Sequence, residues 1–252
     1  IKGRDFSPPL RASRLEFRVD GDEFSLQPVE LEAGKGSIYA FSRMVLENFG
    51  LSSYEVHATL NKANIERIGS SKLVADGSLS LTGDRRGGQL SGTSLSATGI
   101  ITHPLNLGEI ILGTGDVVRP QAAPDPLLEN IVLDVEIDIP RLRIRNALAD
   151  LEIEGGIAFS GTAQNPVITG NAATLDNGTI EYLDTKFEVE TGRIEFLNRT
   201  PLESFTSLID YPLEQTNPEV TMRAQASRVR DIYGGEYDVA LNLTGRALQQ
   251  NL

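Results

Sequence analysis

Apolar and polar residues alternate along most of this chain, a pattern typical of half-buried β-strands. The clearest run covers residues 131–139, where every odd-numbered position is isoleucine, leucine or valine and most even-numbered positions are acidic. Shorter runs occur at 14–19 and 55–60. Because successive side chains of a strand point to opposite faces, each run has one apolar face and one water-facing face. The alternation predicts an all-β protein.

Glycine, proline and one capping sequence mark where strands are expected to end or bend. Gly178 and Gly192 each precede an alternating segment, so we expect short hairpins or sharp bends there. The sequence Thr-Pro-Leu-Glu at 200–203 supplies an N-cap, a proline at the first helical position and a capping-box glutamate. It predicts one short helix near residues 201–209.

A proline-rich segment, residues 119–126, divides the chain. Prolines cannot donate to a β-ladder and favour extended backbone, which indicates a linker or a loop. The expected organisation is a set of β-trough repeats over residues 1–118 and a second β-trough region over 127–252. Two separate domains and one continuous sheet with a loop both remain open.

The chain resembles itself when it is shifted by 78 positions. Residues 77–92 then superpose on 155–170, with glycine on glycine at Gly77, Gly83 and Gly92. A further partial copy at 241–245 repeats the Leu-x-Leu-Thr-Gly pattern of 79–83. Such repetition predicts a quasi-one-dimensional stack of units, each burying its apolar face against its neighbours. We therefore expect an elongated sheet, curved where glycines permit bends.

Composition and charge narrow the function. The chain is 40% hydrophobic but only 6% aromatic, with no tryptophan, which favours a thin apolar layer over a thick core. Its net charge of -12 would repel phosphate backbones and anionic lipid headgroups at long range, so nucleic acid is not an expected partner and a lipid would have to bind through the apolar lining. There is no cysteine, no apolar run long enough for a spanning helix and no starting methionine. We interpret the chain as a fragment of a longer protein.

No residue pattern in the sequence supports catalysis, a cofactor or a metal. His57 occupies the polar side of an alternating strand and His103 precedes a proline, so neither has a plausible catalytic partner. The acidic residues within 131–139 are interpreted as the solvated face of a strand. The alternating arginines within 141–145 are interpreted as a solvent face paired with neighbouring carboxylates. Nucleotide-binding loops and nucleophile elbows are missing.

One family shares the order and spacing of the strands in the second half. A proline-led strand at 165–170 is followed by a Gly-Thr strand at 178–182 and by an Ile-x-Phe strand that ends 186–196. The segments at 218–222 and 239–245 continue this pattern. Over about residues 131–246 the chain resembles the C-terminal region of TamB proteins, and before that it shares only a looser strand-and-glycine pattern.

The resemblance implies a non-enzymatic periplasmic scaffold of an inner-membrane-anchored protein in the bacterial envelope. TamB relatives form part of a translocation and assembly module that meets an outer-membrane barrel of the TamA or BamA type. They are implicated in phospholipid transport and in barrel-protein assembly and secretion. The implied fold is a long, taco-like β-trough with an apolar groove, and the barrel contacts are expected in segments outside this chain.

The trough floor is assigned to apolar strand positions on the uncharged side of their strands. Phospholipid acyl chains are the expected occupants. These lining residues are Leu79, Leu81, Ile157, Phe159, Ile180, Tyr182, Phe187, Val189, Ile194, Phe196, Leu241 and Leu243.

Two alternatives remain open from the sequence. The groove could serve lipid transport, barrel assembly or both. A parallel β-helix, as an adhesin or a polysaccharide-acting enzyme, would instead need coils shorter than a 78-residue unit and, for a lyase, a charged cluster on one exposed sheet.

Overall fold

The described part of the chain is almost entirely β-structure. The computed structural model describes residues 11–12, 14–48, 50–67, 71–102, 126–175, 178–197, 218–230 and 235–246. The strands are β1 (Arg11–Ala12), β2 (Phe17–Asp20), β3 (Glu23–Ala33), β4 (Gly36–Glu47), β5 (Gly50–Arg67), β6 (Ser71–Asp84), β7 (Gly87–Ile101), β8 (Ile131–Arg145), β9 (Ala149–Gly161), β10 (Pro166–Thr174), β11 (Gly178–Tyr182), β12 (Thr185–Phe196), β13 (Glu219–Arg230) and β14 (Glu236–Arg246). The helix α2 (Pro126–Glu129) precedes β8. The helix expected near 201–209 lies outside the described residues.

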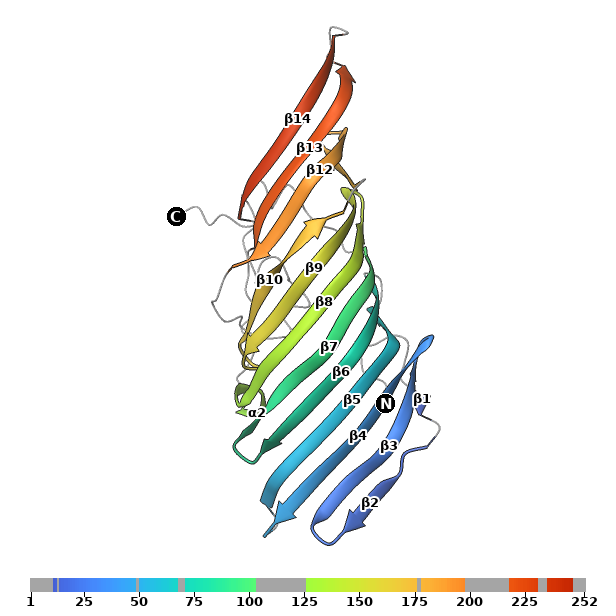
Figure 1. Cartoon of the computed structure of the whole chain (residues 1–252), viewed down its shortest axis with the longest axis vertical. Helices are drawn as coiled ribbons and strands as arrows, with labels where there is room; N and C mark the ends of the chain where they lie inside the picture. Colours follow the sequence, from blue (N-terminus) through green and yellow to red (C-terminus); the bar gives the residue numbers. More distant parts are fainter. Residues whose placement is uncertain are drawn as a thin grey trace.

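All of these strands belong to one 14-stranded sheet. Its main path runs β1-β3-β4-β5-β6-β7-β8-β9-β10-β12-β13-β14, while β2 pairs with β3, and β11 pairs with β9 and β12. The strands lie obliquely one after another along the long axis of the molecule, and β13 and β14 are at the opposite end from β2 (Figure 1). The all-β, elongated fold expected from the sequence is confirmed.

Neighbouring strands are antiparallel except for β7 and β8, which are parallel. This arrangement excludes a parallel β-helix, in which neighbours run in the same direction. A parallel pair needs a long crossover connection, and the chain between Ile101 and Ile131 supplies it. The proline-rich segment 119–126 falls in this connection, and all but its last residue lie outside the described part. Because Leu90 pairs with Leu133, the sheet continues across the proposed division between 1–118 and 127–252.

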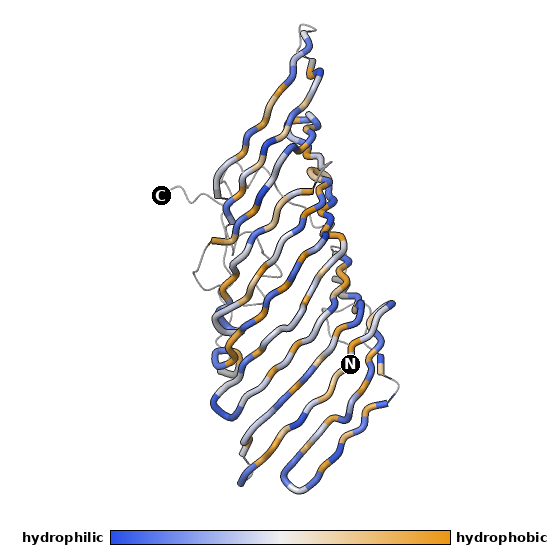
Figure 2. Tube along the Cα trace, in the orientation of Figure 1, coloured by the Kyte–Doolittle hydropathy of each residue, from blue (hydrophilic) through white to orange (hydrophobic). Residues whose placement is uncertain are grey.

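Hydrophilic and hydrophobic residues alternate along many of the strands (Figure 2). Because successive side chains of a strand point to opposite faces, this alternation gives the sheet two different faces. In β8, Ile131, Leu133, Val135 and Ile139 are buried, whereas the intervening acidic residues are exposed. The acidic run is therefore the water-facing side of a strand, as the sequence predicted. We call the side of the sheet that carries Leu133 and Val135 the apolar face, and the opposite side the polar face.

The apolar face is continuous from strand to strand, because directly paired residues share a face. One row of paired residues crosses seven strands, from β2 to β8, nearly at right angles to their direction. This row is Phe17, Leu26, Ser42, Val56, Leu81, Leu90 and Leu133. Farther along the sheet, Val135 pairs with Phe159, which pairs with Ile168. Apolar side chains therefore form rows that cross from strand to strand along the length of the sheet.

The sequence repeat corresponds to a repeat in strand register. In β6 and β7, Leu79 pairs with Gly92. A shift of 78 positions takes this pair to Ile157 and Gly170, which pair in β9 and β10. The neighbouring pair Leu81 and Leu90 maps in the same way onto Phe159 and Ile168. The two copies are thus equivalent hairpins in one sheet, each with a glycine opposite an apolar residue.

β-Bulges keep the apolar residues on one side. In β8 the register shifts between Ile139 and Leu142, so these two residues are both buried although they are three positions apart. Pro140 lies in this bulge, where no ladder hydrogen bond has to be donated. A similar shift in β5 places Lys62 at a φ of 47°, and its backbone N–H donates to Asp76 Oδ1 at 2.9 Å. Bulges also bend and twist a sheet, which gives the trough its curvature.

Gly77 should be one of the positions of the sheet that tolerate a side chain least. It has a φ of +120°, and a Cβ added there would lie 2.5 Å from the carbonyl oxygen of Ser94. Gly77→Ala is therefore expected to lower the free energy of unfolding by about 1–3 kcal/mol. Gly156→Ala is the matched control, because its added Cβ would come no nearer than 3.6 Å to Ile137 O. Urea denaturation of the two variants checks this, and equal midpoints would contradict it.

Candidate functional site

The strand register places the lining residues predicted from the sequence on the apolar face. Leu79 and Leu81 pair with apolar-face residues of β5, and Ile157 and Phe159 pair with Ile137 and Val135 of β8. Toward the C-terminal end, Ile194 pairs with Val220, and Leu243 pairs with Met222. The register continues this side of the sheet through the remaining lining residues of β11, β12 and β14. Their role in contacting an acyl chain stays a prediction.

At the C-terminal end, the apolar face is a packed core. Ile180, Phe187 and Val189 are buried. They form one cluster with buried residues of β9 and β13, and Tyr182 and Leu241 pack against it. A second cluster, made of Ile139, Leu142, Ile153 and Ala172, lies in the middle of the sheet and has Ile157 packed against it. Several predicted lining residues therefore have a structural role in holding strands together.

At the N-terminal end, the apolar face is open. Phe17 is 73% exposed, Val19 61%, Phe24 37%, Met44 38% and Val56 40%. These residues adjoin one another, because Val19 pairs with Phe24 and Phe24 with Met44. Single exposed apolar residues are ordinary, but a contiguous apolar patch indicates a binding surface. We call these residues the open patch.

Sequence analysis missed the open patch as a binding surface. The alternation around Phe17 and Val56 did predict strands, but it could not distinguish an apolar side that is covered from one that is not. The sequence carried one signal for these residues, which marks them as apolar-face positions but not as exposed ones. It was the same period-two pattern that gave the predicted lining residues farther along the chain.

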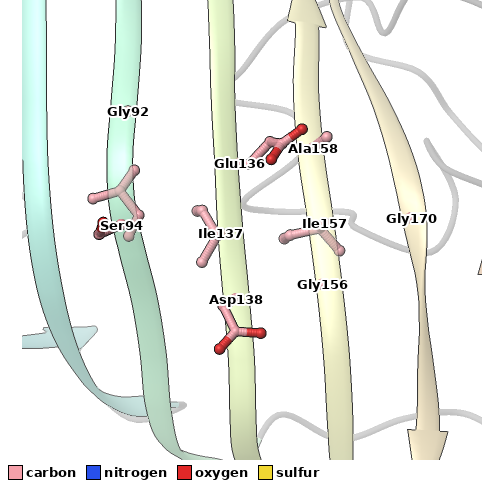
Figure 3. Close-up of a pocket in the computed structure, with 10 residues that line it drawn as sticks. Gly92, Ser94, Glu136, Ile137, Asp138, Gly156, Ile157, Ala158 and Gly170 are labelled. Atoms are coloured by element: carbon pink, nitrogen blue, oxygen red, sulfur yellow. The ribbon is translucent and has the colours of Figure 1, made fainter.

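Several hollows lie along the described part of the sheet, and two of them are relevant here. One, of about 430 Å³, is lined by Leu95, Ile137 and Ile157, by the acidic Glu136 and Asp138, and by the glycines at 92, 156 and 170, which have no side chains to fill it. Figure 3 shows Ile137 and Ile157 on the adjoining strands β8 and β9. The other hollow, of about 590 Å³, has apolar walls that include Met44 and Leu81.

The polar face carries ion pairs across neighbouring strands. Arg141 pairs with Glu152, and Arg143 Nε donates to Asp150 Oδ1 at 2.7 Å. The predicted pairing of the arginine stripe with carboxylates is confirmed for these two residues. The hydrogen bond from Arg143, assisted by its charge, holds the pKa of Asp150 below its usual range despite some desolvation. The charged side chains of the polar face are therefore paired with one another on the water-facing side of the sheet.

His57 also lies on the polar face. Its Nε2 contacts a carboxylate oxygen of Glu55, and its ring stacks on Phe41 with the ring centroids 4.6 Å apart. This agrees with the surface role predicted for His57. His103 lies outside the described residues.

Metal-ligand chemistry is not apparent in the part of the chain that the structure describes. Among these residues, no group of three or more histidine, aspartate or glutamate side chains is placed to hold a metal ion. The described helix is also far too short to cross a membrane, and the described part of the chain contains no candidate membrane-spanning helix.

The comparison with protein families agrees with this geometry. The family model of the TamB C-terminal domain matches residues 29–252. The chain belongs to the TamB family. The match extends the resemblance noted over 131–246 through most of the N-terminal half, and it includes Met44 and Val56 of the open patch. No curated protein and no solved structure matches the chain.

Membership of the TamB family indicates the general role of this chain. The family is a non-enzymatic transport and assembly module of the cell envelope that associates with TamA-type partners. A long sheet with a continuous apolar face and an ion-paired polar face is consistent with a module of this kind. It offers an extended surface rather than a cluster of reactive groups.

The stability of this TamB domain should depend on Asp150 at acidic pH. A carboxylate whose pKa is lowered by folding stabilises the folded state above its unfolded pKa of about 3.9, and this stabilisation is lost as the pH falls through the lower, folded value. Asp150→Asn should therefore reduce the fall in melting temperature between about pH 5 and pH 2.5. Asp138→Asn, which changes an exposed carboxylate of β8, is the matched control. Thermal unfolding monitored by circular dichroism checks this, and identical pH profiles for native protein and Asp150→Asn would contradict it.

Proposed function

We propose that the apolar face carries phospholipid acyl chains across the periplasm, as part of an inner-membrane-anchored TamB protein that reaches the outer membrane. The observation that carries this proposal is the largely apolar face that runs from strand to strand and is open to solvent over β2–β5. An enclosed pocket would hold one ligand. A continuous face lets an amphiphile shift from one strand to the next.

The energetics of such a face suit transport. Each methylene removed from water contributes about 0.8 kcal/mol, so an acyl chain gains substantial affinity from apolar contact alone. Where equivalent apolar pairs recur, the gain is similar at the corresponding positions. Recurring hairpins such as β6–β7 and β9–β10, with equivalent pairs, provide this uniformity. An acyl chain moving between such hairpins therefore meets no single deep trap.

Assembly of outer-membrane barrel proteins is the second candidate function. Among the described strands, β14 pairs only with β13, and β2 pairs only with β3. A strand with one unpaired edge can accept a further strand through main-chain hydrogen bonds. In this alternative, a nascent barrel strand, or a strand of a TamA-type or BamA-type partner, would extend the sheet.

Photocrosslinking distinguishes the two faces of β5. Val56 and Thr59 are both exposed and lie on opposite faces of the same strand. A benzophenone amino acid at Val56 of the full-length protein in its native envelope should crosslink phospholipid, whereas the same group at Thr59 should give only background.

Val56→Arg should impair the outer-membrane permeability barrier, because it places a cation on the apolar path, while Thr59→Arg should not.

Mass spectrometry of the crosslinked protein identifies the adduct, and protein levels in each strain exclude a folding defect. Crosslinks from Val56 to unfolded barrel protein with no lipid adduct would favour the assembly candidate. Equal lipid adducts from both positions would contradict a specific lipid path.

A further inference from the structure

The larger hollow combines apolar walls with a basic corner. Its volume is about 590 Å³, within the range of ligand pockets. It lies where β4, β5 and β6 meet the turn between β6 and β7 and the start of β8. Its apolar residues are Met44, Leu51, Tyr54, Leu81 and Ile131, and its remaining residues are Asp84, Arg85, Arg86, Gly87 and Asn130.

The basic corner consists of Arg85 and Arg86, which form the two-residue turn between Asp84 and Gly87. The backbone N–H of Arg86 donates to Asp84 Oδ1 at 2.6 Å, so this carboxylate holds the turn. Both arginine side chains are exposed, and among the described residues neither has an ion-pair partner. Other arginines of this acidic chain, such as Arg43 and Arg143, do pair with carboxylates.

Tyr54 extends the polar end of the hollow. Its ring lies over two glycines, since a Cβ added at Gly83 would be 2.6 Å from its Cζ and one at Gly88 would be 2.3 Å from its Oη. These glycines, which pair with each other across β6 and β7, leave room for the ring. The Tyr54 hydroxyl has no hydrogen-bond partner within the described part of the structure.

We infer that this hollow is a docking site for an anionic phospholipid, an inference that rests on the lipid-carrying function proposed above. Arg85 and Arg86 bind the headgroup phosphate, with the Tyr54 hydroxyl as a further donor. Guanidinium groups match the geometry of phosphate oxygens and form charge-assisted hydrogen bonds. Two arginines and Asp84 leave one net positive charge at the corner, which favours a headgroup with one net negative charge, such as glycerophosphate, over zwitterionic ethanolamine.

A path for the acyl chain begins at the hollow. Ile131, Gly88, Gly83, Tyr54, Met44, Phe24 and Val19 form one row of directly paired residues on the apolar face. From β6 to β2 this row spans four strand spacings, or about 19 Å. An acyl chain occupies half of a hydrocarbon core of about 30 Å, so about 15 Å of path is required. The open patch thus accommodates the chain while the turn holds the headgroup.

Competition between two lipids tests the headgroup site. The full-length protein in detergent is mixed with equal amounts of phosphatidylglycerol and phosphatidylethanolamine, and native mass spectrometry measures the ratio of bound lipids. The native protein should prefer phosphatidylglycerol. Arg85→Ala combined with Arg86→Ala should lower that preference by about tenfold or more, because two charge-assisted contacts are lost. Arg141→Ala combined with Arg145→Ala removes the same charge from β8 and should leave the preference unchanged.

The outcomes separate the inference from the function on which it rests. An unchanged lipid ratio in the Arg85 and Arg86 variant, with phospholipid crosslinks at Val56 intact, overturns the headgroup site and leaves lipid transport standing. An equal loss of preference in the Arg141 and Arg145 variant also overturns the site, because overall charge would then explain the preference. Absence of bound lipid in every variant, together with no lipid crosslink at Val56, overturns both proposals.

Discussion

The two-residue period of the β-strand is the constraint on which this molecule depends. In one extended sheet, each strand must match its neighbours in hydrogen-bond register and must also keep its apolar residues on the shared side. A slip of one residue would move a whole strand's apolar set into water. Bulges reconcile these demands, as between Ile139 and Leu142, where an irregular step restores the burial of the following residues. Glycines such as Gly77 supply the backbone conformations that neighbouring bulges require.

The apolar face changes character along the sheet. Around Phe187 and Val189 it forms a packed core that joins β9, β11, β12 and β13. Around Phe17, Val19 and Met44 it remains accessible. Burial at one end gives the sheet stability, and exposure at the other leaves apolar surface for a ligand. A binding role therefore falls more naturally on the open patch than on several of the lining residues inferred from the sequence.

The charged residues of the polar face offset the exposed apolar surface of the open patch by keeping the other side of the sheet hydrophilic. Ion pairs such as Arg141 with Glu152 and Arg223 with Glu190 join neighbouring strands across the outside of the sheet. Exposed pairs of this kind contribute little stability individually. They do, however, neutralise several arginines locally, whereas Arg85 and Arg86 have no ion-pair partner among the described residues and lie beside an apolar hollow.

The sequence by itself determined the fold class, the apolar face and the repeat, because these depend on local periodicity. Alternation over residues 131–139 requires a two-sided strand, and the shift of 78 positions already paired Leu79 with Ile157 as equivalent positions. The tertiary structure alone decided the parallel pairing of β7 and β8, the positions of the bulges and the difference between covered and open parts of the apolar face. It also brought Tyr54, Arg85 and Ile131 to one hollow. These features arise from contacts between residues distant in sequence, which a period-two pattern does not specify.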